Sequence, residues 1–277
     1  MLIKYNEPLA NHTTFKIGGP ARRLLFPESR AEFLDTLRDC PDALILGKGS
    51  NVLAPDGGVD KDVISTLLYN EITLDGNAVT AACGATLATL ANFAAENSLS
   101  GLEFASGIPG TVGGAVRMNA GAYGGEMSQT VSSVEVYSKG EVLTVADSGF
   151  SYRHSRYVDS GEVILSVTLT LTPGVTSEII ALQQEYNRRR RDKQPLEYPS
   201  AGSSFKRPQG HYAAELIDRA ACKGLQIGKA QVSEKHAGFI VNLGGASASD
   251  VEALMALVSE RVFEQSGLVL EPEVVRL

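Results

Sequence analysis

Two glycine-rich segments constrain this chain more than any other sequence feature. The first, Gly47-Lys48-Gly49-Ser50-Asn51, directly follows the apolar run Ala43–Leu46, which is typical of a buried strand. The second lies near the middle of the chain and spans Ser106–Ala115. Because glycine has no Cβ, backbone amides in such loops can approach an anion closely. Two such loops in one chain predict a long anionic ligand, such as the pyrophosphate of a dinucleotide.

The spacing of these glycines excludes two common nucleotide-binding classes. Neither loop has the GxxxxGK[ST] pattern of a P-loop, and neither has GxGxxG followed by an acidic residue. A P-loop ATPase and a doubly wound NAD domain are therefore disfavoured.

Charge and composition narrow the partners. The net charge of −7 argues against nucleic acid. The sequence shows no apolar stretch long enough for a membrane helix and no secretory pattern at its start, so we expect no membrane partner and a cytoplasmic location. Cys40, Cys83 and Cys222 are odd in number and lack CxxC spacing, which predicts free thiols rather than disulfides. The four histidines show no metal spacing, so no metal is expected.

The hydrophobic pattern predicts an α+β chain. Helical spacing or capping signals predict helices at about 29–40, 87–96, 177–193, 212–221 and from 249 to 266. Alternating or short apolar runs predict strands at 43–46, 63–67, 72–74, 78–83, 131–137, 141–145, 163–171, 238–241 and 268–277.

Six blocks in order along the chain carry a family resemblance. They are Asn11–Gly19, Gly47–Leu53, Ser106–Gly125, Phe150–Arg153, Ala201–Lys206 and Leu270–Val274. Together they resemble the UDP-N-acetylenolpyruvoylglucosamine reductases, the MurB family, over nearly the whole chain. No tyrosine-bearing insertion is seen between Arg153 and Lys193, so the chain is similar to the shorter subtype.

The resemblance implies an FAD-binding fold of the vanillyl-alcohol-oxidase (PCMH) type in two lobes, with a small C-terminal α+β substrate domain. The implied boundaries are 1–66 for the first lobe, joined by the tail 268–277; 67–195 for the second lobe; and 196–267 for the substrate domain. It also implies NADPH-dependent reduction of the enolpyruvyl group of UDP-N-acetylenolpyruvoylglucosamine to UDP-N-acetylmuramate, with non-covalent FAD, in peptidoglycan precursor synthesis. Two alternatives remain: another FAD-dependent oxidase or dehydrogenase of the superfamily, or a non-catalytic flavin-binding module.

The chemistry of that reaction asks for three groups. Hydride addition to the double bond leaves negative charge beside a carboxylate, which needs a cation, an orienting group and a proton donor. The resemblance implies that Arg153 stabilises the charge, Ser203 donates the proton and Glu273 orients the enolate. From the residues alone, Ser204 and Glu271 are the alternatives to Ser203 and Glu273.

Binding residues follow from the same matches. Lys193, Arg190 and Tyr123 are predicted to contact the substrate, whereas Arg207 departs from the asparagine common in longer members, which puts a nucleotide contact there in doubt. The predicted cofactor-binding residues are Gly47, Lys48, Gly49, Ser50, Asn51, Ser106, Gly107, Ile108, Gly110, Thr111, Gly113, Gly114, Asn119 and Gly121.

Overall fold

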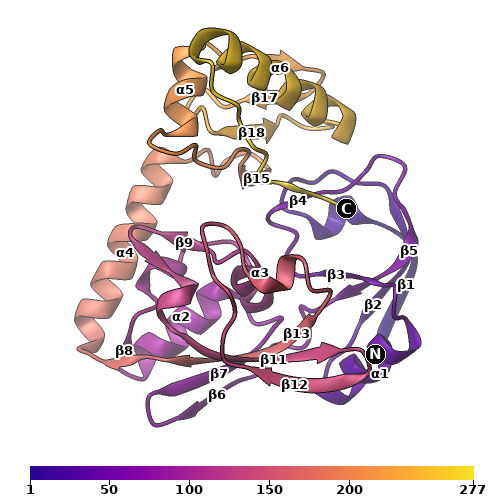
Figure 1. Ribbon diagram of the computed structural model, residues 1–277, viewed down its shortest axis with the longest axis vertical. Coiled ribbons are helices and arrows are strands. Elements are labelled where there is room, and N and C mark those ends of the chain that lie inside the picture. Colours follow the sequence, from indigo (N-terminus) through magenta and orange to yellow (C-terminus); the bar gives the residue numbers. More distant parts are fainter. The chain divides into compact units, whose positions relative to one another are not determined.

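A computed structural model describes all residues 1–277 (Figure 1). They form two compact units. Unit 1 comprises Met1–Ile3, Leu24–Lys48 and Asp62–Arg190, and unit 2 comprises Lys4–Arg23, Gly49–Lys61 and Arg191–Leu277. The chain thus passes repeatedly from one unit to the other, so each unit is built from segments that are distant in sequence. The three-part division expected from the family stays a prediction.

Unit 1 is built on a five-stranded antiparallel sheet of order β12-β11-β13-β7-β6. The strands are β6 (Ile72–Asp75), β7 (Ala78–Ala82), β11 (Val131–Ser138), β12 (Glu141–Val145) and β13 (Val163–Thr170). The β6–β7 and β11–β12 hairpins form where Gly76 and Gly140 adopt φ values of 61° and 90°. Both are left-handed conformations that glycine adopts without strain.

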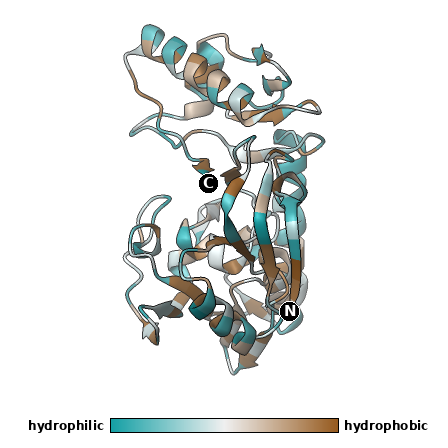
Figure 2. Ribbon diagram, turned by 90° about the vertical axis from the view of Figure 1, so that its right-hand side faces the viewer, coloured by the Kyte–Doolittle hydropathy of each residue, from teal (hydrophilic) through white to brown (hydrophobic).

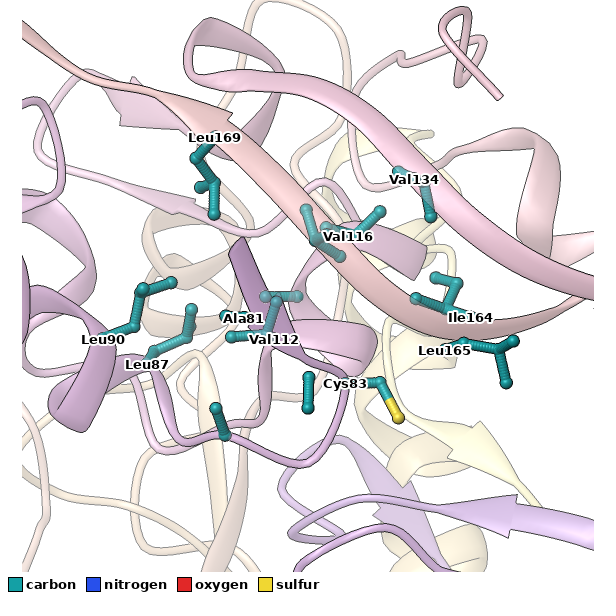
Figure 3. Close-up of a cluster of buried hydrophobic side chains, with 14 of the residues drawn as sticks. Ala81, Cys83, Leu87, Leu90, Val112, Val116, Val134, Ile164, Leu165 and Leu169 are labelled. Carbon is teal, nitrogen blue, oxygen red and sulfur yellow. The ribbon is translucent and has the colours of Figure 1, made fainter. Parts of the chain in front are cut away.

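Two helices cover this sheet and bury its core. Helix α2 (Leu87–Glu96) begins at the Thr86 cap and α3 (Val112–Arg117) at the Thr111 cap. Figure 3 shows side chains of both helices gathered with those of β7, β11 and β13. The members Leu87, Leu90, Val112, Val116, Val134, Leu165 and Leu169 are all fully buried. This packing fixes the start of α3, and with it the end of the second glycine-rich segment.

A second sheet has the order β1-β2-β5-β3 and includes the strand that precedes the first glycine segment. Its strands are β1 (Leu2–Pro8), β2 (Pro20–Phe26), β3 (Leu44–Leu46) and β5 (Val59–Ser65). Strands β3 and β5 are parallel, with Leu46 opposite Ser65. Helix α1 (Arg30–Asp39) begins at Ser29, whose side chain accepts from Glu32 N, as the capping pattern predicted.

Unit 2 contains an antiparallel sheet of order β15-β18-β17-β16 and two helices. The strands are β15 (Ser200–Ser203), β16 (Gln226–Ile227), β17 (Ala230–Val232) and β18 (Phe239–Asn242), and the helices are α5 (Ala213–Arg219) and α6 (Ala248–Ser266). Hydrophobic and hydrophilic residues alternate around the helices (Figure 2), and the apolar stripe of α6 is buried against this sheet.

The remaining elements are short, apart from α4. The strands are β4 (Val52–Leu53), β8 (Leu99–Ser100), β9 (Gly121–Ala122), β10 (Gly125–Glu126), β14 (Thr172–Pro173) and β19 (Val275–Arg276). The 3-10 helices are Leu9–His12, Glu103–Ala105, Met127–Gln129 and Arg156–Val158. Helix α4 spans Thr176–Lys193.

Three predicted boundaries were wrong. The strand expected at 63–67 is β5, which spans Val59–Ser65. The cap of α6 is Ser247 rather than Ser249, because Ser247 and Asp250 form the reciprocal capping box. The tail does not form a continuous strand: Val275–Arg276 pairs in parallel with β4, and Pro272 forms an isolated bridge with Phe205. Pro272 lacks an amide hydrogen, so it cannot donate to the hydrogen-bond ladder that a continuous strand would need.

Candidate functional site

In unit 1 the two glycine-rich segments meet. A Cβ on Gly47 would lie 2.3 Å from Thr111 Oγ1, so only glycine allows this approach. Gly47 directly follows the last residue of β3, Leu46, and Thr111 caps α3. The predicted cofactor residues Gly47, Lys48 and Thr111 are therefore neighbours, although more than 60 residues of sequence separate them.

Backbone hydrogen bonds hold the 106–114 loop (Ser106–Gly114), both within the loop and to neighbouring segments. Ile108 N donates to Ala105 O, Gly110 N to Ile108 O, Val112 N to Ala85 O and Gly113 N to Cys83 O. Thr111 also forms a β-bridge with Thr86. These amides already have backbone partners. The glycines here therefore allow close packing and a preformed shape, and they do not supply a row of vacant donors.

Two buried hydroxyls at the end of β5 test whether this region fits a bound FAD. Ser65 Oγ and Thr66 Oγ1 are buried and have no hydrogen-bond partner. Thr66 N donates to Leu46 O at 3.0 Å, which places both residues beside the start of the first glycine segment. An unsatisfied buried hydroxyl costs about 1–3 kcal/mol. Unsatisfied donors next to a glycine turn fit a ligand rich in phosphate and carbonyl oxygens, as FAD is.

The Arg153 turn is fixed to the segment that holds Asn119 and Gly121. Ser151 and His154 exchange backbone hydrogen bonds of 3.0 and 3.2 Å, and Arg153 between them has a φ of 55°. Asn119 Nδ2 donates to Ser151 O at 3.1 Å, and Arg153 Nη2 donates to Gly121 O at 3.4 Å. Such a conformation is uncommon for a non-glycine residue and suggests a functional constraint.

Asn119 and Gly121 also stabilise the local structure. Asn119 is buried, and its Oδ1 accepts from Ser128 N at 3.0 Å. A Cβ on Gly121 would lie 2.5 Å from Gly125 O across the β9–β10 hairpin. Their assignment to cofactor binding stays a prediction.

Two predicted substrate residues, Tyr123 and Arg190, lie together in unit 1. The Tyr123 ring stacks on Tyr186 with centroids 4.5 Å apart and planes 10° from parallel. Arg190 Nη1 donates to Gly107 O, and burial lowers the pKa of Arg190, although Tyr123 opposes that shift. Burial raises the pKa of Tyr123, whereas Arg190 lowers it. A half-buried cation and a partly exposed aromatic pair thus adjoin the 106–114 loop.

In unit 2 the Gly49 turn (Gly49–Asn51) organises the surrounding segments. Gly49 has a φ of 61°, and a Cβ there would lie 2.5 Å from His12 O. Its carbonyl accepts from Thr14 N at 3.2 Å. Asn51 Nδ2 donates to Glu273 O at 3.0 Å, and Asn51 O accepts from Val275 N at 2.9 Å. The observed partner of the Asn51 amide is therefore the C-terminal tail.

The structure separates Ser203 from its neighbour Ser204. Ser204 is 3% exposed, and its Oγ accepts from Ile240 N at 3.1 Å within the sheet. Ser203 is the last residue of β15 and is only partly buried. Between Ser200 and Ser203 the pairing with β18 shifts register, and Gly202 has a φ of 78°. A bulge of this kind re-aims side chains. Ser204 is therefore buried inside the sheet, and Ser203 is the more accessible of the two hydroxyls.

Glu273 and Glu271 are distinguished in the same way. Glu271 is 68% exposed and forms an ion pair with Lys206. Glu273 is partly buried, and its amide donates to Ser204 O at 2.9 Å. Pro272, which lies between the two glutamates in sequence, forms an antiparallel β-bridge with Phe205. Ser203 and Glu273, which are 70 positions apart in sequence, are thus carried by two segments that lie side by side.

The other predicted features are more peripheral. Lys193 is exposed at the end of α4, and Arg207 lies 4.4 Å over the Tyr212 ring. Cys83 and Cys222 are buried free thiols, Cys40 is a half-buried one, and burial raises the pKa of Cys83 to about 12. No group of three or more His, Cys, Asp or Glu side chains is placed to hold a metal ion. No helix has both the length and the apolar character needed to cross a membrane.

Sequence reasoning missed three residues near these segments. Ser65 and Thr66 sit in an ordinary strand pattern, and only the lack of a partner for their hydroxyls marks them. Thr14 lies in the recognised block Asn11–Gly19, but nothing in the sequence indicates that its hydroxyl donates to Ser200 O at 2.7 Å.

Known proteins match the chain along its length. A family model described as the C-terminal domain of UDP-N-acetylenolpyruvoylglucosamine reductase matches residues 194–277, and an FAD binding domain model matches 21–146. UDP-N-acetylenolpyruvoylglucosamine reductase of Pseudothermotoga lettingae is 48% identical over 275 residues, 98% of this chain and 96% of that protein. The protein of the same name from Caldicellulosiruptor bescii is 46% identical, covering 97% and 88%.

A solved structure agrees. The crystal structure of UDP-N-acetylenolpyruvylglucosamine reductase (MurB) from Thermus caldophilus is 38% identical, with a TM-score of 0.87 over 100% of this chain and 99% of that one. These matches confirm the family and the α+β FAD-binding fold expected from the sequence. The chain belongs to the UDP-N-acetylenolpyruvoylglucosamine reductase family.

Proposed function

We propose that Arg153, Ser203 and Glu273 perform the protein's part in the reaction of this family. That reaction is the NADPH-dependent reduction of the enolpyruvyl group of UDP-N-acetylenolpyruvoylglucosamine, which gives UDP-N-acetylmuramate for peptidoglycan synthesis. The chain is therefore an FAD-dependent oxidoreductase with a UDP-sugar substrate.

A bound FAD, once reduced by NADPH, would supply the hydride for the terminal carbon of the double bond. The Gly47–Asn51 segment and the 106–114 loop would hold the FAD, with the hydroxyls of Ser65 and Thr66 as further donors. Tyr123, Arg190 and Lys193 are assigned to the substrate, where the cations suit its diphosphate.

Arg153 stabilises the negative charge that develops on the substrate carboxylate. A guanidinium stays charged at any physiological pH, and its planar fork matches two carboxylate oxygens. The hydrogen bonds that tie the Arg153 turn to Asn119 and Gly121 favour a preorganised cation. Preorganisation matters because the charge then needs no reorientation of the protein as it forms.

Ser203 donates a proton to the carbon beside the carboxylate, and Glu273 orients the group being protonated. The observation that carries this assignment is the burial of the competing Ser204, which is 3% exposed and whose Oγ is held inside the sheet as the acceptor of Ile240 N. The bond between Glu273 N and Ser204 O keeps the glutamate next to the donor strand. A serine hydroxyl is a weak acid, but a carbanion beside a carboxylate is a strong enough base to take its proton.

Anaerobic spectroscopy of the purified protein tests the function. NADPH should bleach the visible flavin absorbance, and UDP-N-acetylenolpyruvoylglucosamine should restore it with formation of UDP-N-acetylmuramate. Bleaching without recovery on the enolpyruvyl sugar would favour another oxidase or dehydrogenase, and no bleaching by NADPH would favour a non-catalytic flavin-binding module. We further propose that the enzyme works in the cytoplasm, where its NADPH is available, and without a metal, a membrane or a nucleic acid.

A further inference from the structure

We infer that Thr14 is a positioning residue for the proton donor, an inference that rests on the proposed role of Ser203. Thr14 Oγ1 donates to Ser200 O at 2.7 Å, while Thr14 N donates to Gly49 O at 3.2 Å. One residue thus joins the Gly49 turn to the first residue of the strand that ends in Ser203. All of these residues belong to unit 2.

The strand needs such an anchor because its own ladder is incomplete. Ser200 pairs with Val241 and Ser203 with Phe239, but the register shifts between the two pairs. With Gly202 in a left-handed conformation, the path from Ser200 to Ser203 is not set by regular sheet pairing. Thr14 fixes the carbonyl at the start of this irregular stretch, and Ser204 fixes its end through Ile240 and Gly238. Ser203 lies between these two anchors.

Thr14 is itself held rigidly. The next residue, Phe15, is 1% exposed in the core of unit 2, and its carbonyl accepts from Asn242 Nδ2 at 3.0 Å. Removing only the Thr14 hydroxyl leaves that anchorage intact, so the fold should persist while Ser200 loses one restraint. The Gly49 turn also holds Glu273 through Asn51. Thr14 and Asn51 therefore tie both members of the Ser203–Glu273 pair to one turn.

The neighbouring threonine supplies a matched control. Thr13 is 2% exposed, and its Oγ1 donates to Ile17 O at 3.2 Å within the same loop, away from the Ser203 strand. Thr13→Val and Thr14→Val remove the same hydroxyl from adjacent positions at constant shape. A general loosening of the loop would appear in both variants, whereas loss of donor positioning would appear only in Thr14→Val.

The test is rapid-mixing measurement of both half-reactions in the FAD-loaded protein. Thr14→Val should slow flavin reoxidation by UDP-N-acetylenolpyruvoylglucosamine by about 10- to 100-fold, since small misplacements of a reacting group have effects of this size. Flavin content and reduction by NADPH should stay at wild-type values. The solvent deuterium isotope effect on reoxidation should rise as proton transfer becomes more limiting, and Thr14→Ser should restore the rate.

Three results would overturn the inference: equal slowing of both half-reactions, equal slowing in Thr13→Val, or a Thr14→Ser variant no faster than Thr14→Val. Ser203→Ala, measured in parallel, separates this inference from the proposed function. If Ser203→Ala reoxidises at the wild-type rate, the proposed function itself fails. If Ser203→Ala is slow but Thr14→Val behaves like Thr13→Val, only the role of Thr14 fails.

Discussion

The 106–114 loop of unit 1 and the Ser200–Phe205 segment of unit 2 are both irregular, but they are held in different ways. The loop is fixed mainly by backbone hydrogen bonds, two of them to Cys83 and Ala85, with two further bonds from the α4 side chains of Asn187 and Arg190. The Ser200–Phe205 segment is fixed by the side chain of Thr14, from 186 positions away, and by the tail around Glu273. Backbone hydrogen bonds thus do most of the shaping in the loop, whereas the Ser200–Phe205 segment is assembled from distant parts of the chain.

This difference explains what each region can do. A loop that is shaped mainly by backbone hydrogen bonds should present the same surface whether or not a ligand is bound. This property suits a cofactor that stays in place. A segment assembled from distant parts can bring together groups such as Ser203 and Glu273 that no local motif could combine. The same assembly makes it sensitive to single side chains elsewhere in the chain.

The largest expected effect is that of Ser203→Ala in the assembled region. Flavin reoxidation by the enolpyruvyl sugar should fall by about 10²–10⁴-fold, the usual contribution of a general acid. Reduction of the flavin by NADPH should be unaffected, because that step needs no proton from Ser203. Rapid mixing of the reduced protein with substrate measures the effect. An equal loss in both half-reactions would contradict the assignment.

Next in size is the substitution Glu273→Gln, compared with Glu271→Gln. Loss of the Glu273 carboxylate should slow reoxidation by about 10²-fold, as expected for a misoriented reacting group. Glu271→Gln breaks only an exposed ion pair with Lys206 and should leave the rate near wild type. Steady-state and single-turnover rates of both variants decide between them. A larger effect at Glu271 would reverse the assignment.

Substitutions in the 106–114 loop should change the stability of the protein. A Cβ at Gly113 would lie 2.9 Å from Cys83 Cβ, so Gly113→Ala should lower the free energy of unfolding by about 1–3 kcal/mol. At Gly114 the nearest atom would be Thr111 Oγ1 at 3.5 Å, and Gly114→Ala should be neutral or slightly stabilising in this helix. Urea denaturation measures both changes. If the two variants are equally stable, packing against Cys83 does not shape the loop.

The smallest expected effect concerns Asp56, which contacts the start of α6 in unit 2. Its carboxylate accepts from Ala248 N, Ser249 N and Ser249 Oγ. Partial burial raises the pKa of Asp56, but these hydrogen bonds together outweigh it and leave the pKa below its usual value. Asp56→Ala should cost about 1 kcal/mol near neutral pH. Because the group is exposed, solvent screening keeps the effect small.

The pH dependence of that variant follows from the sign of the shift. A carboxylate with a lowered folded-state pKa adds stability above its unfolded pKa and loses it as the pH falls through the folded value. The stability difference between wild type and Asp56→Ala should therefore shrink in acid. Denaturation curves across acidic and neutral pH measure it, with the exposed Asp60→Ala as the control. A difference that stays constant with pH would show that the charge of Asp56 is not involved.

The sequence predicted the locally determined parts of the molecule. Helix α2 begins and ends where its apolar spacing indicates, and Ser29 caps α1 as its capping pattern predicts. The start of α6 was misplaced because two serines lie near it, and only the reciprocal bonds of Ser247 and Asp250 decide between them. The assignment of Asn51 to the cofactor stays a prediction, but its motif gave no sign that its side chain also donates to Glu273 O in the tail. A residue whose partner lies 222 positions away cannot be recognised from local spacing.

The most direct test of the central claim is a crystal structure of the protein with FAD and UDP-N-acetylenolpyruvoylglucosamine bound. In that complex, Ser203 Oγ should lie about 3–3.5 Å from the carbon that receives the proton. Arg153 should contact the substrate carboxylate, and Ser204 Oγ should still accept from Ile240 N. A complex in which the Ser203 hydroxyl points away from the enolpyruvyl group, or in which Arg153 does not contact its carboxylate, would contradict these roles.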